Sequence, residues 1–502
     1  MNPIVRTNTG RIQGVDKDGV VLFAGVPFAA PPTGPRRFKP PEPHAGWDGV
    51  LDATRFGKVS VQTGDSLGSI GLARAPDWSE DCLFLNIQTP AVDDALRPVM
   101  VWIHGGAFVN GTGAIPWYDG SGFVIRGNIV VVSINYRLGA LGWLYLGHLD
   151  PAFASSGNNG LLDQIAALDW VRDNISAFGG HPDNVTIFGE SAGAMSVGTL
   201  LGTPAASGKF AKAIAQSGAA HNVSKPADAA VVADALLAEI DGGLDTLLGA
   251  GPEQILEAQT AVSVATSTGR LKSRSTSASG LPFGPVVDGT VLPRPPHDAV
   301  REGSVPSVPL IVGTNRDEWN LFALMAGDVD DADKLRRRVG RVTTRPGSLI
   351  SEYRKALPTA THGELFGAIM TDRVFRVPAI RLAEAQSQHQ PENTFMYLFE
   401  YASTAFDGKL GSCHALEIPF VFDTLDKPGV ELLTGQDPPK SLATCMHEAW
   451  TSFARSGVPE TAAAPPWPPY GSDVRATMHF DVQSRIEKDP GSRERLAWTD
   501  RI

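Results

Sequence analysis

The chain has 502 residues, of which 42% are hydrophobic and 19% are charged. This composition excludes an intrinsically disordered protein and supplies enough apolar side chains for a large buried core. The formal net charge is −11, so the surface repels nucleic acid and anionic lipid, and neither is an expected partner.

The N-terminal segment lacks the features of an export signal. Residues 1–7 have no charged start followed by an apolar run and a small-residue cleavage site. The most apolar stretch, 129–149, contains Asn135 and Arg137, so no run is long and uncharged enough to span a membrane. Three cysteines are too few and too scattered for a disulfide framework or a zinc site. We therefore expect a cytoplasmic protein with no membrane span.

From residue 98 onward, short β-branched runs alternate with segments of helical spacing. This alternation is typical of a parallel sheet with crossover helices. The runs have no polar alternation, as expected of strands that are buried on both faces. The expected strands are 98–103, 129–134, 184–188, 211–216 and 308–313. Helices are expected at 161–171 and 192–201, and the chain is predicted to form an α/β fold.

We expect one domain over residues 1–502, enlarged by insertions. A mainly helical insertion is predicted at about 220–305, and a further helical region at about 325–390. Within the first insertion, 263–280 is rich in Ser, Thr and Ala and carries three basic residues. This composition predicts an exposed, mobile loop, which either stays solvated or acts as a lid over a pocket.

The pentapeptide 189–193 reads Gly-Glu-Ser-Ala-Gly and stands directly between a predicted strand and a predicted helix. In that context a sharp turn holds the serine above the sheet, and the helix N-terminus directs its amides toward developing negative charge. The motif therefore predicts that Ser191 is a nucleophile. Its alternative is an ordinary serine in a turn.

The segment 104–108, His-Gly-Gly-Ala-Phe, follows the first central strand. Attack on an ester places negative charge on the carbonyl oxygen, which backbone amides about 3 Å away can stabilise. Small residues allow that close approach. We expect the amides of Gly106, Ala107 and Ala192 to form this oxyanion hole.

A serine nucleophile needs a histidine base and an acid that orients it, and in this fold the chain order is serine, acid, histidine. Asp317 and Glu318 lie in a loop after a predicted strand, and either could be the acid. His414 lies in an irregular segment, whereas His447 lies in a helical pattern over 442–453. The pattern favours His414 without excluding His447.

Several motifs in order resemble the type-B carboxylesterases, which include the cholinesterases and the bacterial para-nitrobenzyl esterases. The motifs are Ser-Glu-Asp-Cys at 79–82, Asn-Tyr-Arg-Leu-Gly at 135–139, the Gly-Glu-Ser-Ala-Gly pentapeptide, Gln-Ser-Gly at 216–218 and His-Ala-Leu-Glu-Ile-Pro-Phe at 414–420. The resemblance implies an α/β-hydrolase fold, with a large, mostly parallel sheet flanked by helices and insertions around an active-site gorge. It also implies that Glu318 is the acid, that His414 is the base, and that Glu190 is a carboxylate of the substrate pocket.

Cys82 is similar to one half of the family's first disulfide, but the partner region near Val61 and Gln62 has no cysteine, so we expect that bond to be absent. Four aromatic residues are candidate walls of the substrate pocket, although aromatic residues are more often part of a core: Phe108, Phe283, Trp319 and Phe322.

We therefore predict a bacterial serine carboxylesterase that hydrolyses small-molecule esters of small to medium acyl length through an acyl-enzyme on Ser191. No cofactor and no metal are implied, because the sequence has neither HExxH nor a Cys/His ligand set. The rival hypotheses are a non-enzymatic adhesion module and a lipase that acts at lipid interfaces. The sequence predicts neither the natural ester nor the oligomeric state.

Overall fold

The computed structural model describes residues 2–64, 77–271, 280–499 and 501. Its centre is an 11-stranded sheet with the strand order β14-β13-β12-β11-β10-β9-β7-β8-β6-β4-β3. The strands are β3 (Val15–Lys17), β4 (Val20–Pro27), β6 (Phe84–Thr89), β7 (Arg97–Ile103), β8 (Val130–Ile134), β9 (Gly180–Glu190), β10 (Lys212–Gln216), β11 (Leu310–Asn315), β12 (Thr394–Phe399), β13 (Ala476–Phe480) and β14 (Arg485–Lys488). A separate small sheet contains β1 (Ile4–Arg6), β2 (Arg11–Gln13) and β5 (Val50–Asp52).

The sheet is parallel in the middle and antiparallel at both ends. Every adjacent pair in the run β8-β7-β9-β10-β11-β12-β13 is parallel. At one end of the sheet β14 pairs antiparallel with β13. At the other end β8 pairs antiparallel with β6, β6 with β4, and β4 with β3. All five strands expected from apolar runs are present, although β9 begins four residues early and β11 is displaced by two residues. The predicted α/β-hydrolase fold is thus confirmed.

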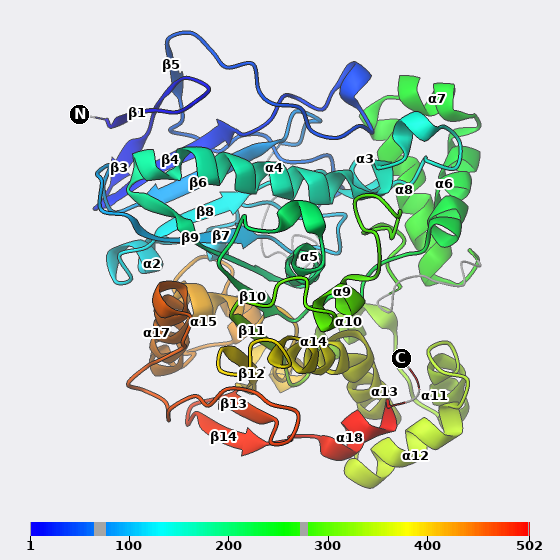
Figure 1. Ribbon diagram of the computed structural model, residues 1–502. Coiled ribbons are helices and arrows are strands. Elements are labelled where there is room, and N and C mark those ends of the chain that lie inside the picture. The colour runs from blue at the N-terminus through cyan, green and yellow to red at the C-terminus, as the bar shows by residue number, and fades with distance from the viewer. Residues whose placement is uncertain (1, 65–76, 272–279, 500, 502) are drawn as a thin grey trace.

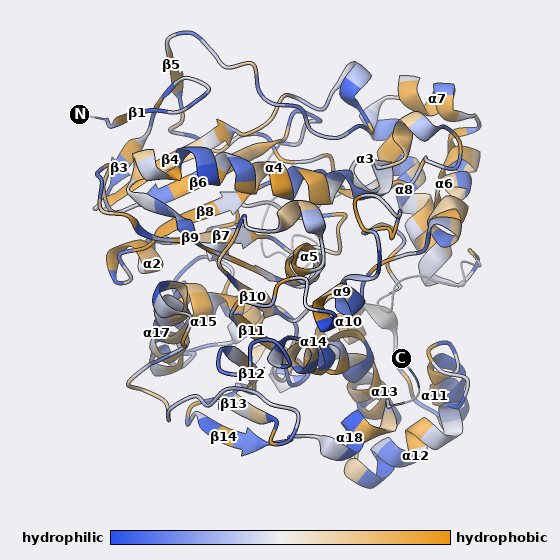
Figure 2. Cartoon of the chain, in the orientation of Figure 1, coloured by the Kyte–Doolittle hydropathy of each residue, from blue (hydrophilic) through white to orange (hydrophobic). Residues whose placement is uncertain are grey.

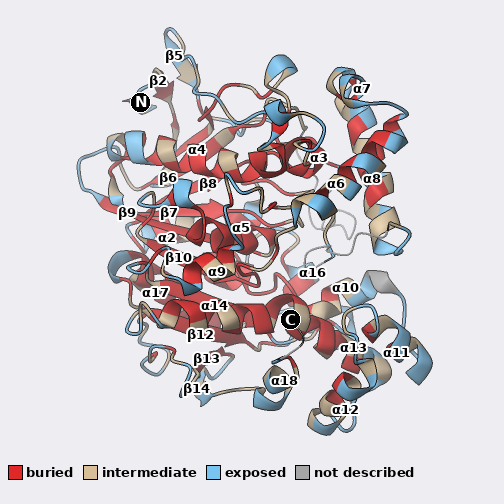
Figure 3. Ribbon diagram, turned by 45° about the vertical axis from the view of Figure 1, so that its right-hand side comes forward, coloured by how far each residue is buried: buried red, intermediate tan, exposed pale blue. Residues whose placement is uncertain are grey.

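The side chains of β7 show why the strands are continuous apolar runs. Val99, Val101 and Ile103 belong to one core, which they share with residues of α4 (Asn159–Asn174), α5 (Ala192–Leu201) and α14 (Val377–Ser387). Met100 and Trp102 belong to a second core, with residues of the helices α2 (Ser121–Ile125), α15 (Ile418–Phe422) and α17 (Lys440–Ser456). Because successive side chains point to opposite faces, helices on both faces require apolar residues at every position. Figure 3 shows the central strands and α5 as the most buried part of the molecule.

Helices also fill the two long connections after β10 and β11. The first contains α6 (Pro226–Ile240), α7 (Leu244–Gly249), α8 (Pro252–Ser267) and α9 (Pro296–Arg301). The second contains α10 (Trp319–Ala326), α11 (Ala332–Val339), α12 (Pro346–Ala356), α13 (His362–Thr371), the π-helical segment η7 (Asp372–Arg376) and α14. In the described part of the chain, the other α-helices are α3 (Gly139–Trp143), α16 (Glu431–Thr434) and α18 (Ser492–Ala497). In Figure 1 the α6–α8 group and the α11–α12 group lie at separate corners beside the sheet, and Figure 2 shows that α4 and α6 carry both hydrophilic and hydrophobic residues.

The prediction of a loop over 263–280 is wrong at its start, because residues 263–267 are the last turn of α8. The Ser263 hydroxyl donates to the Gln259 carbonyl, and the Thr266 hydroxyl donates to the Val262 carbonyl, each four residues back. Serine and threonine hydroxyls inside a helix commonly bond to the carbonyl four residues back, so the composition of 263–267 is compatible with a helix. Residues 272–279 lie outside the described part of the chain.

Among the described residues, no helix has the length and apolarity needed to cross a membrane.

Candidate active site

Ser191 lies in the sharp turn that joins β9 to α5. Its backbone has φ 55° and ψ −123°, a region that non-glycine residues rarely adopt. The turn is held on both sides, because the Ser191 amide donates to the Gln216 carbonyl at 2.9 Å and its carbonyl accepts from the Met195 amide at 2.8 Å. Backbone strain of this kind persists only where the surrounding structure enforces it, and it is concentrated at functional sites.

Glycines around this turn allow α5 and the end of β7 to approach each other. A Cβ atom at Gly193 would lie 1.9 Å from the Ile103 carbonyl oxygen, and one at Gly189 would lie 2.6 Å from the same atom. A Cβ atom at Gly105 would lie 3.1 Å from Ser191 Cβ. The glycine loop after β7 therefore passes directly beside the predicted nucleophile.

That loop presents backbone amides that no other described group uses. Gly106 has φ 107° and Ala107 has φ 56°, so the chain turns sharply here. Within the described part of the chain, neither amide donates a hydrogen bond, whereas the Gly106 carbonyl accepts from Val109 and Asn110. Ala192 begins α5, and the first amides of a helix have no partner within it. The three predicted oxyanion-hole amides thus belong to segments that meet at Ser191.

His104, the first residue of the same loop, is held in place by Tyr136. Its ring stacks on Tyr136 with a centroid separation of 4.5 Å, and the Tyr136 hydroxyl donates to the His104 carbonyl at 2.8 Å. Burial lowers the pKa of His104 to about 4, so this ring is neutral near pH 7. The loop is therefore held by a neutral, packed histidine that is separate from the predicted base.

The structure brings Glu318 and His414 together. Glu318 Oε2 lies 2.6 Å from His414 Nδ1, and Glu318 Oε1 accepts a hydrogen bond of 2.8 Å from the Asn315 amide. Both side chains are buried. The alternatives lie elsewhere: Asp317 accepts from the Ser412 amide and pairs with Arg316, and His447 hydrogen-bonds the Val421 carbonyl. The geometry thus favours Glu318 over Asp317 as the partner of a histidine.

His414 lies between two carboxylates. Its Nε2 atom, the one that would take a serine proton, lies 3.1 Å from Glu190 Oε1. Burial lowers the pKa of His414, but the charges of Glu190 and Glu318 outweigh it and raise the pKa to about 9. Burial and the charges of Glu417 and Glu318 raise the pKa of Glu190 to about 8, against the opposing charge of His414. Among the described residues the Ser191 hydroxyl makes no hydrogen bond, so its link to Nε2 stays a prediction.

A buried polar network, not predicted from the sequence, lies behind Glu318. Glu417 accepts hydrogen bonds from the Asn315 side chain at 2.6 Å and from Gln216 at 3.2 Å, and Gln216 in turn accepts from the Trp450 indole at 3.0 Å. Burial and the charge of Glu318 raise the pKa of Glu417 to about 7. One feature of the sequence could have predicted this network: Glu417 is the only charged residue in the apolar run Ala-Leu-Glu-Ile-Pro-Phe, and a buried acid needs hydrogen-bond partners.

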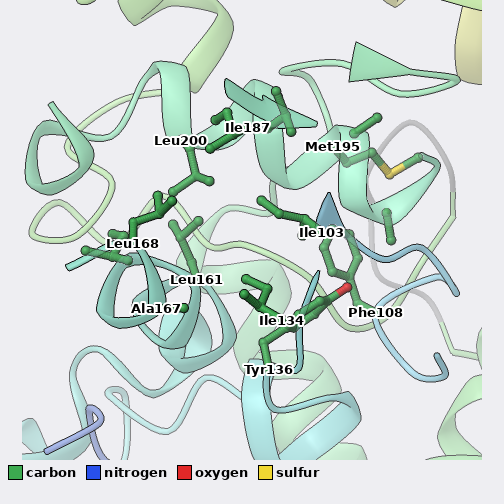
Figure 4. Packing of buried hydrophobic residues seen from close by; sticks show 14 of the residues in the cluster. Ile103, Phe108, Ile134, Tyr136, Leu161, Ala167, Leu168, Ile187, Met195 and Leu200 are labelled. Atoms are coloured by element: carbon green, nitrogen blue, oxygen red, sulfur yellow. The ribbon is translucent and has the colours of Figure 1, made fainter. Parts of the chain in front are cut away.

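The four candidate pocket aromatics fall into two groups. Phe322 lies 5.1 Å from the His414 ring, and Trp319 lies 5.1 Å from Phe322 and lines a cavity of about 880 Å³. Phe108 and Phe283 are fully buried in the main core, where Phe108 packs near Ile134 and Tyr136 (Figure 4). A role for these four as pocket walls stays a prediction.

Phe375 was missed, although its ring lies 4.8 Å from that of His414. It belongs to η7, and π-helical turns are frequent at functional sites. No local sequence pattern distinguishes it from an ordinary core residue.

Comparison with known proteins decides the family. The family model described as "Carboxylesterase family" matches residues 1–498. The chain belongs to this family. The para-nitrobenzyl esterase of Bacillus subtilis is 40% identical, with 98% of this chain and 97% of that protein covered. The phenmedipham hydrolase of Pseudarthrobacter oxydans is 33% identical, with coverage of 95% and 94%.

Solved structures agree with this family. The carboxylesterase EST55 of Geobacillus stearothermophilus has a TM-score of 0.86 at 41% identity and covers 99% of this chain and 100% of its own. A para-nitrobenzyl esterase structure has a TM-score of 0.88 at 39% identity, with 99% of each chain covered. The resemblance to type-B carboxylesterases is confirmed, and the protein is a carboxylic ester hydrolase of the serine-hydrolase class.

All three cysteines of this carboxylesterase are free and buried: Cys82, Cys413 and Cys445. The family's first disulfide is therefore absent, as the lack of a cysteine near Val61 predicted. Within the described ranges, no group of three His, Cys, Asp or Glu side chains could hold a metal ion.

Proposed function

We propose that this carboxylesterase hydrolyses small-molecule esters of small to medium acyl length through an acyl-enzyme on Ser191. The observation that carries the proposal is the buried Glu318–His414 hydrogen bond of 2.6 Å, beside the strained turn that holds Ser191. A carboxylate at Nδ1 fixes the tautomer that leaves Nε2 free to accept a proton, and it stabilises the imidazolium that forms.

In the proposed acylation, Ser191 Oγ bonds to the carbonyl carbon while its proton passes to His414 Nε2. The carbonyl oxygen becomes anionic and receives hydrogen bonds from the amides of Gly106, Ala107 and Ala192, each of which is worth on the order of 100-fold or more in rate. The C–O bond to the alcohol then breaks, and His414 returns the proton to the departing oxygen. Water attacks the acyl-enzyme by the same route, with His414 first as base and then as acid.

Glu190 has a separate proposed role. Glu190 directly precedes Ser191, and its Oε1 atom lies 3.1 Å from His414 Nε2. A negative charge there stabilises the imidazolium that forms in each step. We propose Glu190 as a carboxylate of the substrate pocket.

The direct test is a series of p-nitrophenyl esters of increasing acyl length, assayed with the native protein and with Ser191→Ala. We expect activity to fall by at least about 1000-fold in the variant, since removal of a nucleophile leaves only binding and oxyanion stabilisation. Unchanged hydrolysis by Ser191→Ala would overturn the mechanism. An ester of p-nitrobenzyl alcohol is a suitable second substrate, because it is the one named for the Bacillus relative.

The same series separates an esterase from a lipase. An esterase with a small pocket saturates smoothly below the solubility limit of its substrate, and we expect that behaviour here. A jump in rate above the solubility limit would instead favour an interfacial lipase. An adhesion module would show no Ser191-dependent hydrolysis of any ester.

A further inference from the structure

The π-helical segment η7 lies beside both members of the Glu318–His414 pair. In η7 the Val377 amide donates to the Asp372 carbonyl, five residues back, so this turn is wider than the α-helices α13 and α14 on either side of it. Single π-helical turns of this kind are rare and are concentrated at functional sites. The contacts that hold η7 in place therefore bear on the proposed catalytic residues.

The residue before η7 holds the segment that carries the predicted acid. Thr371 Oγ1 accepts a hydrogen bond of 3.1 Å from the Trp319 amide, and Trp319 directly follows Glu318 at the start of α10. The first amides of a helix have no partner within it, so Thr371 supplies one that α10 lacks. Thr371 is buried, and this hydrogen bond therefore ties the position of Glu318 to that of η7.

The other end of η7 packs on the predicted base. The Phe375 ring lies 4.8 Å from the His414 ring and 6.1 Å from the Phe322 ring, which itself lies 5.1 Å from His414. Phe322 and Phe375 therefore limit the positions that the imidazole can take. Because Thr371 and Phe375 lie within one helical turn of each other, a shift of η7 would disturb both partners of the 2.6 Å hydrogen bond between Glu318 and His414.

A buried polar network anchors η7 to α12. The Tyr353 hydroxyl, in α12, donates to Asp372 Oδ2 and accepts from the Trp498 indole at 2.7 Å. Arg376 pairs with the same carboxylate, through Nε at 2.6 Å and Nη2 at 3.0 Å. Burial raises the pKa of Tyr353 well above its usual value, so the hydroxyl keeps its proton and remains a donor. The Asp372 carboxylate, which is 1% exposed, is thus held from two sides.

We propose that Tyr353 and Asp372 are positioning residues for the ester hydrolysis. Tyr353 fixes the carboxylate of Asp372, and Asp372 fixes η7, which in turn sets the relative position of Glu318 and His414. A displacement of catalytic groups by about 1 Å can cost on the order of 100-fold in rate, so a network at this remove can still affect turnover. The inference rests on the proposed function of the Glu318–His414 pair and adds the residues that hold that pair in place.

Tyr353→Phe tests this role, because it removes only the hydroxyl and keeps the buried ring. We expect kcat for a p-nitrophenyl ester to fall by about 10-fold while KM stays within about 2-fold of the native value, since the change affects the geometry of the base and not the binding of substrate. The matched control is Tyr401→Phe, which removes a buried hydroxyl that donates to the Thr434 carbonyl at 3.1 Å in the second core. It should lower the melting temperature by a similar amount and leave kcat within about 2-fold.

The hydrogen bond between Glu318 and His414 can be followed directly by ¹H NMR. The proton on His414 Nδ1 resonates downfield of the backbone amides because its hydrogen bond is short and charge-assisted, and its signal is assigned as the one missing in His414→Gln. At one fixed pH we expect Tyr353→Phe to move this signal upfield and Tyr401→Phe to leave it in place. The signal does not depend on which residue attacks the ester, so the inference and the proposed role of Ser191 can fail separately.

Thr371 provides a second test through the other contact of η7. Thr371→Val keeps the shape of the side chain but leaves the Trp319 amide unpaired, and it should lower kcat by about 10-fold. Thr371→Ser keeps the hydroxyl and should stay within about 3-fold of the native rate. The inference is overturned if Tyr353→Phe keeps the native kcat and the native His414 signal, if Tyr401→Phe changes both as much, or if the two Thr371 variants have equal kcat.

Discussion

His414 is bordered by carboxylates at both ring nitrogens, so the charge it carries depends on Glu190 as well as on Glu318. Catalysis as proposed needs the neutral ring, because only then can Nε2 accept a proton. The pKa of about 9 means that the neutral fraction increases as pH rises through that value. We therefore expect kcat/KM of the native protein to rise with pH over this range.

Removal of the Glu190 charge should move this profile. Glu190→Gln takes away a negative charge that lies 3.1 Å from Nε2, lowers the pKa of His414, and shifts the rise in kcat/KM to lower pH. The measurement is the pH profile of p-nitrophenyl ester hydrolysis. Glu42→Gln, an exposed carboxylate paired with Arg36, is the control and should leave the profile unchanged. Identical profiles for Glu190→Gln and the native protein would show that Glu190 does not affect His414.

The two histidines that the sequence left open can be separated by substitution. His414→Gln should lower kcat by at least about 1000-fold, because the serine then lacks a base. His447→Gln should stay within about 3-fold of the native rate, because that ring contacts Phe123 and Val421 and not the Ser191 turn. Equal losses in both variants would contradict the assignment of the base.

Residues differ in how well the sequence predicts them. Ser191 and the glycines beside it could be predicted because the strained turn depends on neighbours in the chain. Glu417 and Phe375 could not, because they meet Asn315 and His414 only after segments about 40 to 100 residues apart have packed together, and nothing local marks such contacts.

Among the secondary-structure elements, the contact between α5 and β7 sets the position of Ser191, the proposed nucleophile. Gly193→Ala would place a methyl group 1.9 Å from the Ile103 carbonyl oxygen, a backbone atom that cannot rotate away. We expect a loss of about 3 kcal/mol or more in the free energy of unfolding, together with lower activity, since α5 must shift and move Ser191. Chemical denaturation and the ester assay measure the two effects.

A matched control is available in another helix. Gly249→Ala adds the same methyl group at the end of α7, where nothing lies within 4 Å, and it should change stability by less than about 1 kcal/mol. If both alanine variants unfolded at the same denaturant concentration, the close approach of α5 to β7 would not explain why position 193 is glycine.

The strands were predicted where burial of apolar side chains alone determines the sequence pattern. β7 and β8 could be predicted as strands because helices cover both faces of the sheet there, so nearly every residue of these strands is apolar. The end of α8 was not predicted, because serine and threonine are typical of loops, and composition does not show that their hydroxyls bond to carbonyls of the preceding helical turn.

For the whole molecule, the buried side chain of Trp498 helps to join the C-terminal segment to the second helical connection. Trp498 is fully buried, and its indole donates to the Tyr353 hydroxyl at 2.7 Å within a core built from α11, α12 and α13. Trp498→Ala should lower the free energy of unfolding by about 3 to 5 kcal/mol, since it leaves a cavity and removes a buried hydrogen bond to the Tyr353 hydroxyl. Leu496→Ala, at a site that is 59% exposed, should change it by no more than about 0.5 kcal/mol. Thermal melts compare the two variants, and equal melting temperatures would contradict the role of Trp498.

Trapping of the acyl-enzyme tests the proposed covalent role of Ser191. The protein is mixed with a p-nitrophenyl ester, quenched in acid during the first turnover, digested, and analysed by mass spectrometry. We expect the acyl group's mass to appear on the peptide that contains Ser191 and to be absent from Ser191→Ala. An acyl group on another residue, or undiminished turnover in Ser191→Ala, would contradict it.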